Sequence, residues 1–279
     1  MTDALPSETP RARALLQKAL AHKRLDWAAF AIALLEYPDI DVRTYEAQLD
    51  GYAQRVMAIK AGAGDALGQM TALRRVLGDE EGFWGNTDKY SAPDNSFLNI
   101  VLERRVGLPI SLSVLYLEVA RRAGIPIFGV SFPGHFLVAA EAAGGKLVMD
   151  PFQGGQILTE AGCGDLLKRV APQVKFMPRM LIPAPVKTVA ARMLNNLKRG
   201  YLDAGDGGRA LRVVDLLLLL NPDHPGELRA RATILSALGA YRAALVDVER
   251  CLELSPDAPD HQNLRLTARA LRQRVEFLN

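Results

Sequence analysis

Apolar side chains in the first third of the chain recur at the spacing of one face of an α-helix. Thr9 followed by Pro10 is typical of a helix start, because the hydroxyl can cap the first turn and proline lacks only an N–H that would be unpaired there. The apolar residues with helical spacing are Leu15, Leu16, Ala19 and Leu20; the segment Leu25 to Leu35; Tyr45, Leu49, Tyr52 and Val56; and Leu67, Met70, Leu73 and Leu77. This pattern predicts a helical region over residues 1–94.

Residues 82–96 break the helical pattern, because glycine and asparagine are frequent there. This composition predicts a loop with tight turns. Two large aromatic residues, Phe83 and Trp84, lie in the loop, where they either anchor it to the core or line a cleft.

Helical spacing returns after Asn95 and again over residues 110–123, where Pro109 suits the first turn of the helix. Alternating strand patterns follow, with Gly144 and Gly145 as a hairpin turn. The predicted strands cover residues 127–131, 135–140 and 146–150, and a further helix lies near residues 159–170. Helices followed by hairpin strands predict an α+β fold, with a small antiparallel sheet in a core of residues 95–180.

The last third of the chain repeats with a period of 34 residues. Leu220-Asn221-Pro222-Asp223 matches Leu254-Ser255-Pro256-Asp257, and at the same offset Gly205 matches Gly239 and Ala210 matches Ala244. The period and these positions resemble tetratricopeptide repeats, which implies helical hairpins over residues 186–279. Residues 178–185 are rich in proline and form the predicted linker to a first domain of residues 1–180. Two repeats are fewer than such an array needs alone, so the last helix, residues 261–277, or the first domain must cover them.

Composition excludes several classes of protein. The net charge of +3 comes from 34 basic and 31 acidic residues, a balance that argues against nucleic acid or an anionic membrane as partner. The two cysteines, Cys163 and Cys251, show no metal-ligand spacing and predict neither a disulfide nor a metal site. The polar start of the chain predicts no signal peptide, and the apolar segments are too short for a membrane span. We therefore expect a cytoplasmic protein without cofactor or metal.

Residues 107–150 combine the parts that a papain-like enzyme needs. Such enzymes place a thiol at a helix N-terminus, a histidine that takes its proton, and a carboxylate that orients the imidazole. Here a helix start is followed by His135 at the beginning of one predicted strand and by Asp150 at the end of the next.

The motifs GLPISLSVLYLEVARRAGIP, PGHF and LVMDP resemble the core of the transglutaminase-like superfamily. More closely, GFWGNTDKY, DNSFLNIVLERRVGLPISLSVLYLEVARR and FPGHFLVAA resemble the bacterial SirB-type transglutaminase-like family, which also ends in tetratricopeptide repeats. The resemblance covers nearly the whole chain and implies a papain-like core. It assigns the histidine and aspartate of the family's triad to His135 and Asp150.

The resemblance places the family's nucleophilic cysteine at Pro109, where this chain has no nucleophile. Proline also lacks the backbone N–H that helps to stabilise the oxyanion in papain-like sites. Loss of one oxyanion donor costs roughly 10²–10³ in rate, and loss of a nucleophile costs about 10⁶. Thiol-dependent acyl transfer is therefore not expected.

Three other residues could supply a nucleophile. Ser111 lies about 200° around the helix from Pro109, and Ser113 lies on the same face as Pro109 but about 6 Å deeper. Each serine reaches His135 only if the helix starts differently, and Ser111 can instead satisfy N–H groups of the first turn. Cys163 lies beyond the strand that carries Asp150 and is otherwise a buried structural residue.

Three functional hypotheses remain open. The first is a non-catalytic protein whose cleft near His135, rimmed by residues 82–96, binds a peptide or a glutamine-like side chain while the repeats hold a protein partner. The second is a hydrolase or acyltransferase that uses Ser111 with His135 and Asp150. The third is a structural role, in which the His–Asp pair only ties two strands together. The sequence does not determine the oligomeric state.

Overall fold

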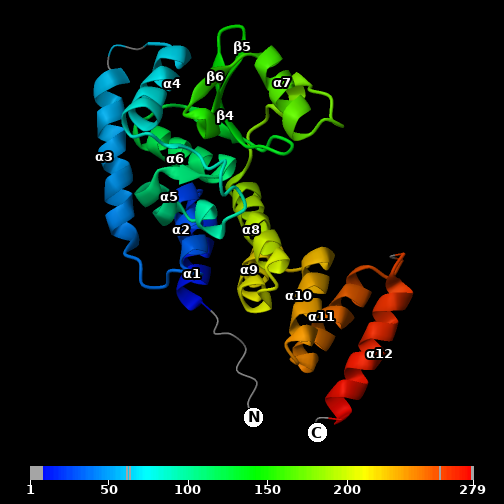
Figure 1. Ribbon diagram of the computed structural model, residues 1–279. Coiled ribbons are helices and arrows are strands. Elements are labelled where there is room, and N and C mark those ends of the chain that lie inside the picture. Colours follow the sequence, from blue (N-terminus) through cyan, green and yellow to red (C-terminus); the bar gives the residue numbers. More distant parts are fainter. Residues whose placement is uncertain (1–8, 61, 63, 258, 278–279) are drawn as a thin grey trace. The chain divides into compact units, whose positions relative to one another are not determined.

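The computed structural model describes residues 9–60, 62, 64–257 and 259–277 (Figure 1). These residues form two compact units. One unit spans residues 14–193, and the other combines the described residues up to Arg13 with those from Leu194 onward. The two units are defined by how the chain packs, whereas the predicted domains rest on the sequence pattern. The domain ranges 1–180 and 186–279 therefore stay a prediction.

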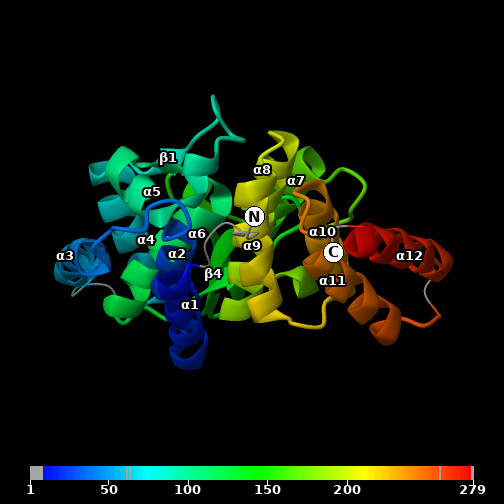
Figure 2. The same ribbon diagram turned by 90° about the horizontal axis from the view of Figure 1, so that it is seen from below.

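Helices predominate at the start of the chain, as the apolar spacing predicts. They are α1 (Pro10–His22), α2 (Leu25–Ala33), α3 (Val42–Lys60), α4 (Ala66–Arg74) and α5 (Leu98–Arg104), and a π-helical turn at Arg75–Glu80 extends α4. Pro10 is the first residue of α1 and follows Thr9, as predicted. Helices α2 to α5 gather around α6 (Pro109–Arg122), as both ribbon views show (Figures 1 and 2).

Helix α6 is the centre of the unit of residues 14–193. Every residue from Pro109 to Ala120 is buried. Leu108 has extended backbone at the N-cap, and Pro109 takes the first helical position, where its fixed φ and missing N–H cost nothing. The predicted helix of residues 110–123 is confirmed, with its start one residue earlier and its end one residue earlier.

A four-stranded antiparallel sheet, in the order β3-β4-β5-β6, lies beside α6. Its strands are β3 (Ile127–Val130), β4 (Leu137–Ala142), β5 (Gly145–Asp150) and β6 (Gln156–Leu158). The hairpin at Gly144 is confirmed, and β6 adds a strand that the sequence pattern did not predict. The α+β fold class with a small antiparallel sheet is confirmed.

The predicted strand over residues 135–140 begins too early. Gly134 has φ +67°, and a Cβ there would approach the Val170 carbonyl oxygen to 2.7 Å, so a glycine turn must precede the strand. His135 lies in this turn, and β4 begins only at Leu137.

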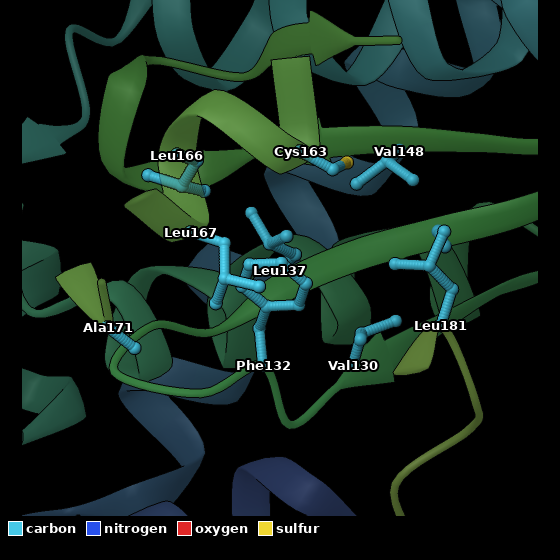
Figure 3. Packing of buried hydrophobic residues seen from close by; sticks show 10 residues of the cluster. Val130, Phe132, Leu137, Val148, Cys163, Leu166, Leu167, Ala171 and Leu181 are labelled. Carbon is cyan, nitrogen blue, oxygen red and sulfur yellow. The ribbon is translucent and has the colours of Figure 1, made fainter. Parts of the chain in front are cut away.

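The second face of the sheet packs against α7 (Glu160–Val170). Leu137 and Val148 contribute to a buried cluster with Leu166 and Leu167 of this helix, and Figure 3 shows these side chains pointing toward one another. Thr159 caps α7, because its hydroxyl accepts a hydrogen bond from the Gly162 N–H at 3.1 Å. The sheet therefore has helices on both faces, α6 on one and α7 on the other.

The loop of residues 82–96 has more internal order than the sequence pattern predicts. Asn95 is buried, and its side chain donates to the carbonyl oxygens of Lys89 and Tyr90, at 2.6 and 3.1 Å. Because Asn95 belongs to a 3₁₀ turn, Pro93–Ser96, the next helix begins at Leu98 rather than at Asn95. In the same loop β1 (Trp84–Gly85) pairs in parallel with β2 (Val106–Gly107).

The unit that contains residues 194–277 consists of helical hairpins. Its helices are the end of α8 (Val186–Asp203), α9 (Gly207–Leu220), α10 (Pro225–Ala237), α11 (Tyr241–Leu254) and α12 (His261–Phe277). Gly205 and Gly239 lie in equivalent turns, with φ of +71° and +81°. Ala210 and Ala244, each near the start of the second helix of a repeat, are fully buried. The predicted tetratricopeptide-like hairpins are confirmed.

A buried charge network joins the start of α2 to α6. Asp26 is 0% exposed and accepts hydrogen bonds from Arg24, at 2.9 and 2.6 Å, and from Arg122. Glu118, also buried, accepts from Arg122 at 2.7 Å and from the Leu25 N–H at 2.9 Å. Burial alone would raise the pKa of Asp26, but the guanidinium groups of Arg24 and Arg122 outweigh it and hold this pKa below its ordinary value.

The replacement Asp26→Ala is expected to lower the free energy of unfolding by about 3–5 kcal/mol, because it removes a fully buried carboxylate that pairs with the guanidinium groups of both Arg24 and Arg122. Tryptophan fluorescence in urea measures this change, since Trp27 and Trp84 both belong to the unit of residues 14–193. Asp50→Ala is the matched control: Asp50 bonds the same Arg122 at 2.8 Å but is 59% exposed, so its loss should cost about 1 kcal/mol or less.

The ion pairs of Asp26 with Arg24 and Arg122 also make the free energy of unfolding depend on pH. Because the pKa of Asp26 is depressed by folding, its contribution is fully present above the unfolded value of about 3.9 and is lost as the pH falls through the lower folded value. The difference in stability between the native protein and Asp26→Asn should therefore shrink below about pH 4. A constant difference from pH 7 to pH 3 would contradict this assignment.

Candidate functional site

His135 and Asp150 meet in the interior, as the sequence predicts for a catalytic-type pair. The His135 Nε2 atom lies 2.9 Å from Asp150 Oδ1, and the two residues are 6% and 2% exposed. Both lie at the same end of the antiparallel pair β4–β5, because β4 begins at Leu137, just after His135, and β5 ends at Asp150. An ionised carboxylate only accepts, so the hydrogen bond places the imidazole proton on Nε2.

Each partner is held by the backbone. The Asp150 Oδ1 atom also accepts from the Phe152 N–H at 3.0 Å, which caps the 3₁₀ turn Pro151–Gln153. The His135 N–H donates to the Phe132 carbonyl oxygen at 3.1 Å. These contacts orient the ring so that Nε2 faces the carboxylate. Among the described residues, Nδ1 has no hydrogen-bond partner.

Aromatic rings surround the His135 imidazole. Phe152 packs edge-on against it, with ring centres 5.7 Å apart, and Tyr90 packs edge-on against Phe152 at 6.0 Å. Tyr90, from the loop of residues 82–96, is 48% exposed, and Gly85 of the same loop lies against the Phe152 ring, so this loop borders the site. Sequence reasoning did not assign Tyr90 or Phe152 to the site. The available signals were the position of Phe152 two residues after Asp150 and, for Tyr90, its place in the loop of residues 82–96 that was expected to rim the cleft.

Ser111 occupies the first turn of α6 and is fully buried. Its hydroxyl accepts from the Leu108 N–H at 2.9 Å and donates to the Asn95 carbonyl oxygen at 2.6 Å. This is the helix-capping role that the residue type favours at N3. The geometry gives the Ser111 proton an acceptor other than His135, so the hydrogen bonds favour a structural role for this serine.

The other two nucleophile candidates lie in apolar surroundings. The Ser113 hydroxyl is buried and donates to the Phe136 carbonyl oxygen at 3.4 Å. Cys163 is fully buried in the cluster between α7 and the sheet, where Figure 3 shows its sulfur near Val148. Burial raises the pKa of the Cys163 thiol to about 11, so it is protonated at neutral pH.

In the part of the chain that the structure describes, no three His, Cys, Asp or Glu side chains form a group that could hold a metal ion. In the same part of the chain, no helix combines the length and the apolar character needed to cross a membrane.

The helical-hairpin unit has a groove of about 540 Å³ between α10, α11 and α12. Its lining residues are Arg229, Ala232, Thr233, Ser236, Ala237, Val248, Leu264, Thr267 and Leu271. The Arg229 Nε atom is buried without a hydrogen-bond partner among the described residues, although Nη2 of the same side chain pairs with Asp260 at 3.2 Å. The groove thus combines apolar walls with an unsatisfied donor.

Comparison with known proteins gives matches over both parts of the chain. The family model of the transglutaminase-like superfamily matches residues 43–195, and a tetratricopeptide-repeat model matches residues 197–272. A UPF0162 protein of Xylella fastidiosa (strain Temecula1) is 41% identical over 235 residues, which cover 82% of this chain and 83% of the relative.

Two further relatives extend the comparison. A UPF0162 protein of Pseudomonas aeruginosa is 32% identical over 265 residues, which cover 94% of this chain and 91% of the relative. The protein SirB1 of Salmonella typhimurium is 30% identical over 204 residues, or 71% of this chain and 76% of the relative.

The buried helix, the antiparallel sheet and the family matches define a transglutaminase-like domain followed by tetratricopeptide repeats. The resemblance to SirB-type proteins is confirmed. The chain belongs to the transglutaminase-like superfamily, in the bacterial family of the UPF0162 and SirB1 proteins.

The tautomer of His135 gives a direct test of the His–Asp pair. At pH 9, where an ordinary imidazole is neutral, we expect long-range ¹H–¹⁵N spectra to show the proton of His135 on Nε2. Asp150→Ala should replace this single form by a mixture of both tautomers. His22, which is exposed, serves as the internal control and should look the same in both proteins. An Nδ1–H form of His135 in the unaltered protein would contradict the pairing.

Ser111→Ala should lower the free energy of unfolding by about 1–2 kcal/mol, because it removes one buried acceptor and one buried donor. The Leu108 N–H keeps a second, longer contact with the Asn95 carbonyl oxygen at 3.3 Å, which limits the loss. Ser113→Ala is the matched control and should cost less, since its single hydrogen bond is 3.4 Å long. Equal stability changes in urea for the two variants would refute the capping role of Ser111.

Proposed function

We propose that this protein is a non-catalytic member of its superfamily, which binds a peptide or a glutamine-like side chain at His135 and Asp150 and holds a protein partner with its repeats. The observation that carries the proposal is Pro109. It is buried at the first position of α6, where the family resemblance places the nucleophile, and it offers neither a thiol nor an N–H.

The hydrogen bonds of Ser111 support the same proposal. A serine nucleophile must give its proton to a histidine base, but the Ser111 hydroxyl lies 2.6 Å from the Asn95 carbonyl oxygen and also accepts from the Leu108 N–H. If Ser111 gave its proton to His135, the first turn of α6 would lose the hydrogen bond from this hydroxyl to the Asn95 carbonyl oxygen.

The state of His135 supports ligand binding rather than a purely structural tie. Its Nε2 atom is fixed by Asp150, while Nδ1 has no acceptor or donor among the described residues. A neutral Nδ1 accepts a hydrogen bond, for example from a backbone or side-chain amide N–H of a ligand. The rings of Phe152 and Tyr90 add apolar surface beside it.

The repeat unit supports the second half of the proposal. Tetratricopeptide repeats in general bind proteins, and the groove between α10, α11 and α12 is a surface of that kind. A cytoplasmic location belongs to the proposal. Both cysteines, Cys163 and Cys251, are free and buried, as in proteins of reducing compartments.

Three measurements on the full chain separate catalysis from binding. Acyl transfer is followed as hydroxamate formation from acetyl-glutaminyl-glycinamide and hydroxylamine, and serine reactivity by intact mass after treatment with a fluorophosphonate. We expect neither hydroxamate nor labelling above the level of His135→Ala. Titration with the same peptide should shift the ring ¹⁵N resonances of His135.

Turnover or labelling that Ser111→Ala abolishes would overturn the proposal in favour of a serine hydrolase or acyltransferase. Absence of any His135 response to the peptide would overturn it in favour of a structural role. Pro109→Cys and Pro109→Ala are a matched pair for the missing nucleophile. If the rest of the site is intact, only the cysteine variant should gain hydroxamate formation, and His135→Ala should remove that gain.

A further inference from the structure

Arg192 reaches the His135 turn from the beginning of α8. Its Nη1 atom donates to the Ser131 Oγ atom and to the Phe132 carbonyl oxygen, both at 2.8 Å. The guanidinium carbon lies 5.6 Å from the centre of the Phe136 ring, and Phe136 directly follows His135. All of these residues belong to the unit of residues 14–193. Arg192 is thus fixed beside the site by three groups that are all neutral.

The edge of the guanidinium formed by Nε and Nη2 is unoccupied by the described residues. Arginine has five N–H donors, and the two on Nη1 are those used by Ser131 and Phe132. The Nε and Nη2 donors point in parallel and match the two oxygens of a carboxylate. In the described part of the chain they have no acceptor.

Other arginines of this chain show what that edge binds. Arg24 donates from Nε and Nη2 to the two oxygens of Asp26, at 2.9 and 2.6 Å. Arg231 donates in the same way to Asp247, at 2.7 and 2.7 Å. Among the residues that the structure describes, no Asp or Glu forms an ion pair with Arg192. The edge is geometrically equivalent in all three side chains, but at Arg192 it lacks its carboxylate.

The electrostatics of Arg192 agree with this geometry. Burial lowers the pKa of Arg192 below its ordinary value, and among the described residues Tyr90, in its ionised form, opposes this effect. Arg24 and Arg231, which have carboxylate partners, have raised pKa values because of hydrogen bonds to Asp26 and Asp247. A desolvated cation without an anion is unfavourable, and a bound anion would compensate it.

We propose that Arg192 binds a carboxylate of the ligand that occupies the His135 site, through its Nε and Nη2 donors. A carboxylate fits better than a phosphate, because its two oxygens match the two parallel donors and its single negative charge is balanced by one guanidinium. The ligand is therefore an acidic peptide or the C-terminal end of a peptide. This inference rests on the proposed function only in assigning the carboxylate to the ligand at His135.

The anion site is tested first without any peptide. The Nε–H resonance of Arg192 is recorded while sodium acetate, sodium phosphate or sodium chloride is added at constant ionic strength. We expect a saturable shift with acetate, a weaker response to phosphate and none to chloride. Arg231, whose edge is filled by Asp247, is the internal control and should not respond. Equal responses of Arg192 to acetate and chloride would overturn the inference.

The peptide arm compares acetyl-glutaminyl-glycine as the free acid and as the amide, with binding read from His135. We expect the free acid to bind at least about tenfold more tightly, and Arg192→Gln to abolish this preference. Arg192→Lys, which keeps the charge but not the parallel donors, should retain only part of it. Arg169→Gln, at an exposed position of α7, removes the same charge and should retain all of it.

The outcomes separate the two proposals. If acetate binds at Arg192 but neither peptide affects His135, the proposed function fails, and with it the assignment of the anion to that ligand. If both peptides bind equally well and shift His135, the proposed function stands and the inference about Arg192 fails. A free-acid preference that survives in Arg192→Gln would also overturn the inference. Urea unfolding must first show that Arg192→Gln and Arg192→Lys are folded.

Discussion

The complete burial of α6 is the constraint on which the transglutaminase-like unit depends. A helix that packs on four helices and a sheet has little water at its polar groups, so partners in the protein must replace it. Among the described residues, the Tyr116 hydroxyl is an exception, because it is buried without a hydrogen-bond partner. At the C-terminal end, Glu118 binds Arg122 and the Leu25 N–H, and Arg122 also binds Asp26. The same charges that allow Glu118 to be buried therefore fix where α2 begins and how it packs on α6.

At the other end of α6 the constraint decides the chemistry. A catalytic thiol at a helix start needs an accessible, unpaired position, whereas this chain has Pro109 at the first position and the Ser111 hydroxyl bonded to Leu108 and Asn95. Both choices stabilise the helix start and leave the backbone there with few free donors. The Asn95 carbonyl oxygen accepts from Ser111 while the Asn95 side chain holds the loop at Lys89 and Tyr90. The helix start and the loop beside the site are consequently one structural element.

Much of this architecture could be predicted from the sequence, because periodicity reports burial directly. The helices, the hairpin at Gly144 and the repeat with its equivalent glycines follow from spacing alone, and the His135–Asp150 pair follows from the family motifs. Features that depend on contacts between distant segments could not be predicted. The pairing of β1 with β2 involves two residues from each strand, too few for a pattern, and the position of His135 outside β4 depends on the approach of Gly134 to Val170. Arg192 lies 57 residues beyond His135 on a helix whose pattern shows only an amphipathic face.

The arginines of this molecule differ in whether the fold supplies a carboxylate partner. Where a guanidinium stabilises the fold, as at Arg24, Arg122 and Arg231, it binds carboxylates of its own unit, and removal of one of them weakens the compensation of its charge. At Arg192 the described part of the fold provides a hydroxyl, a carbonyl oxygen and the Phe136 ring, which orient the side chain without neutralising it. Orientation without neutralisation is what a binding site requires, since the missing charge is then supplied by the ligand and contributes to its affinity. Under the proposed function, a core with Pro109 at the start of α6 keeps the parts of its site that recognise a ligand, because His135 and Arg192 depend on the sheet and on α8 rather than on the start of α6.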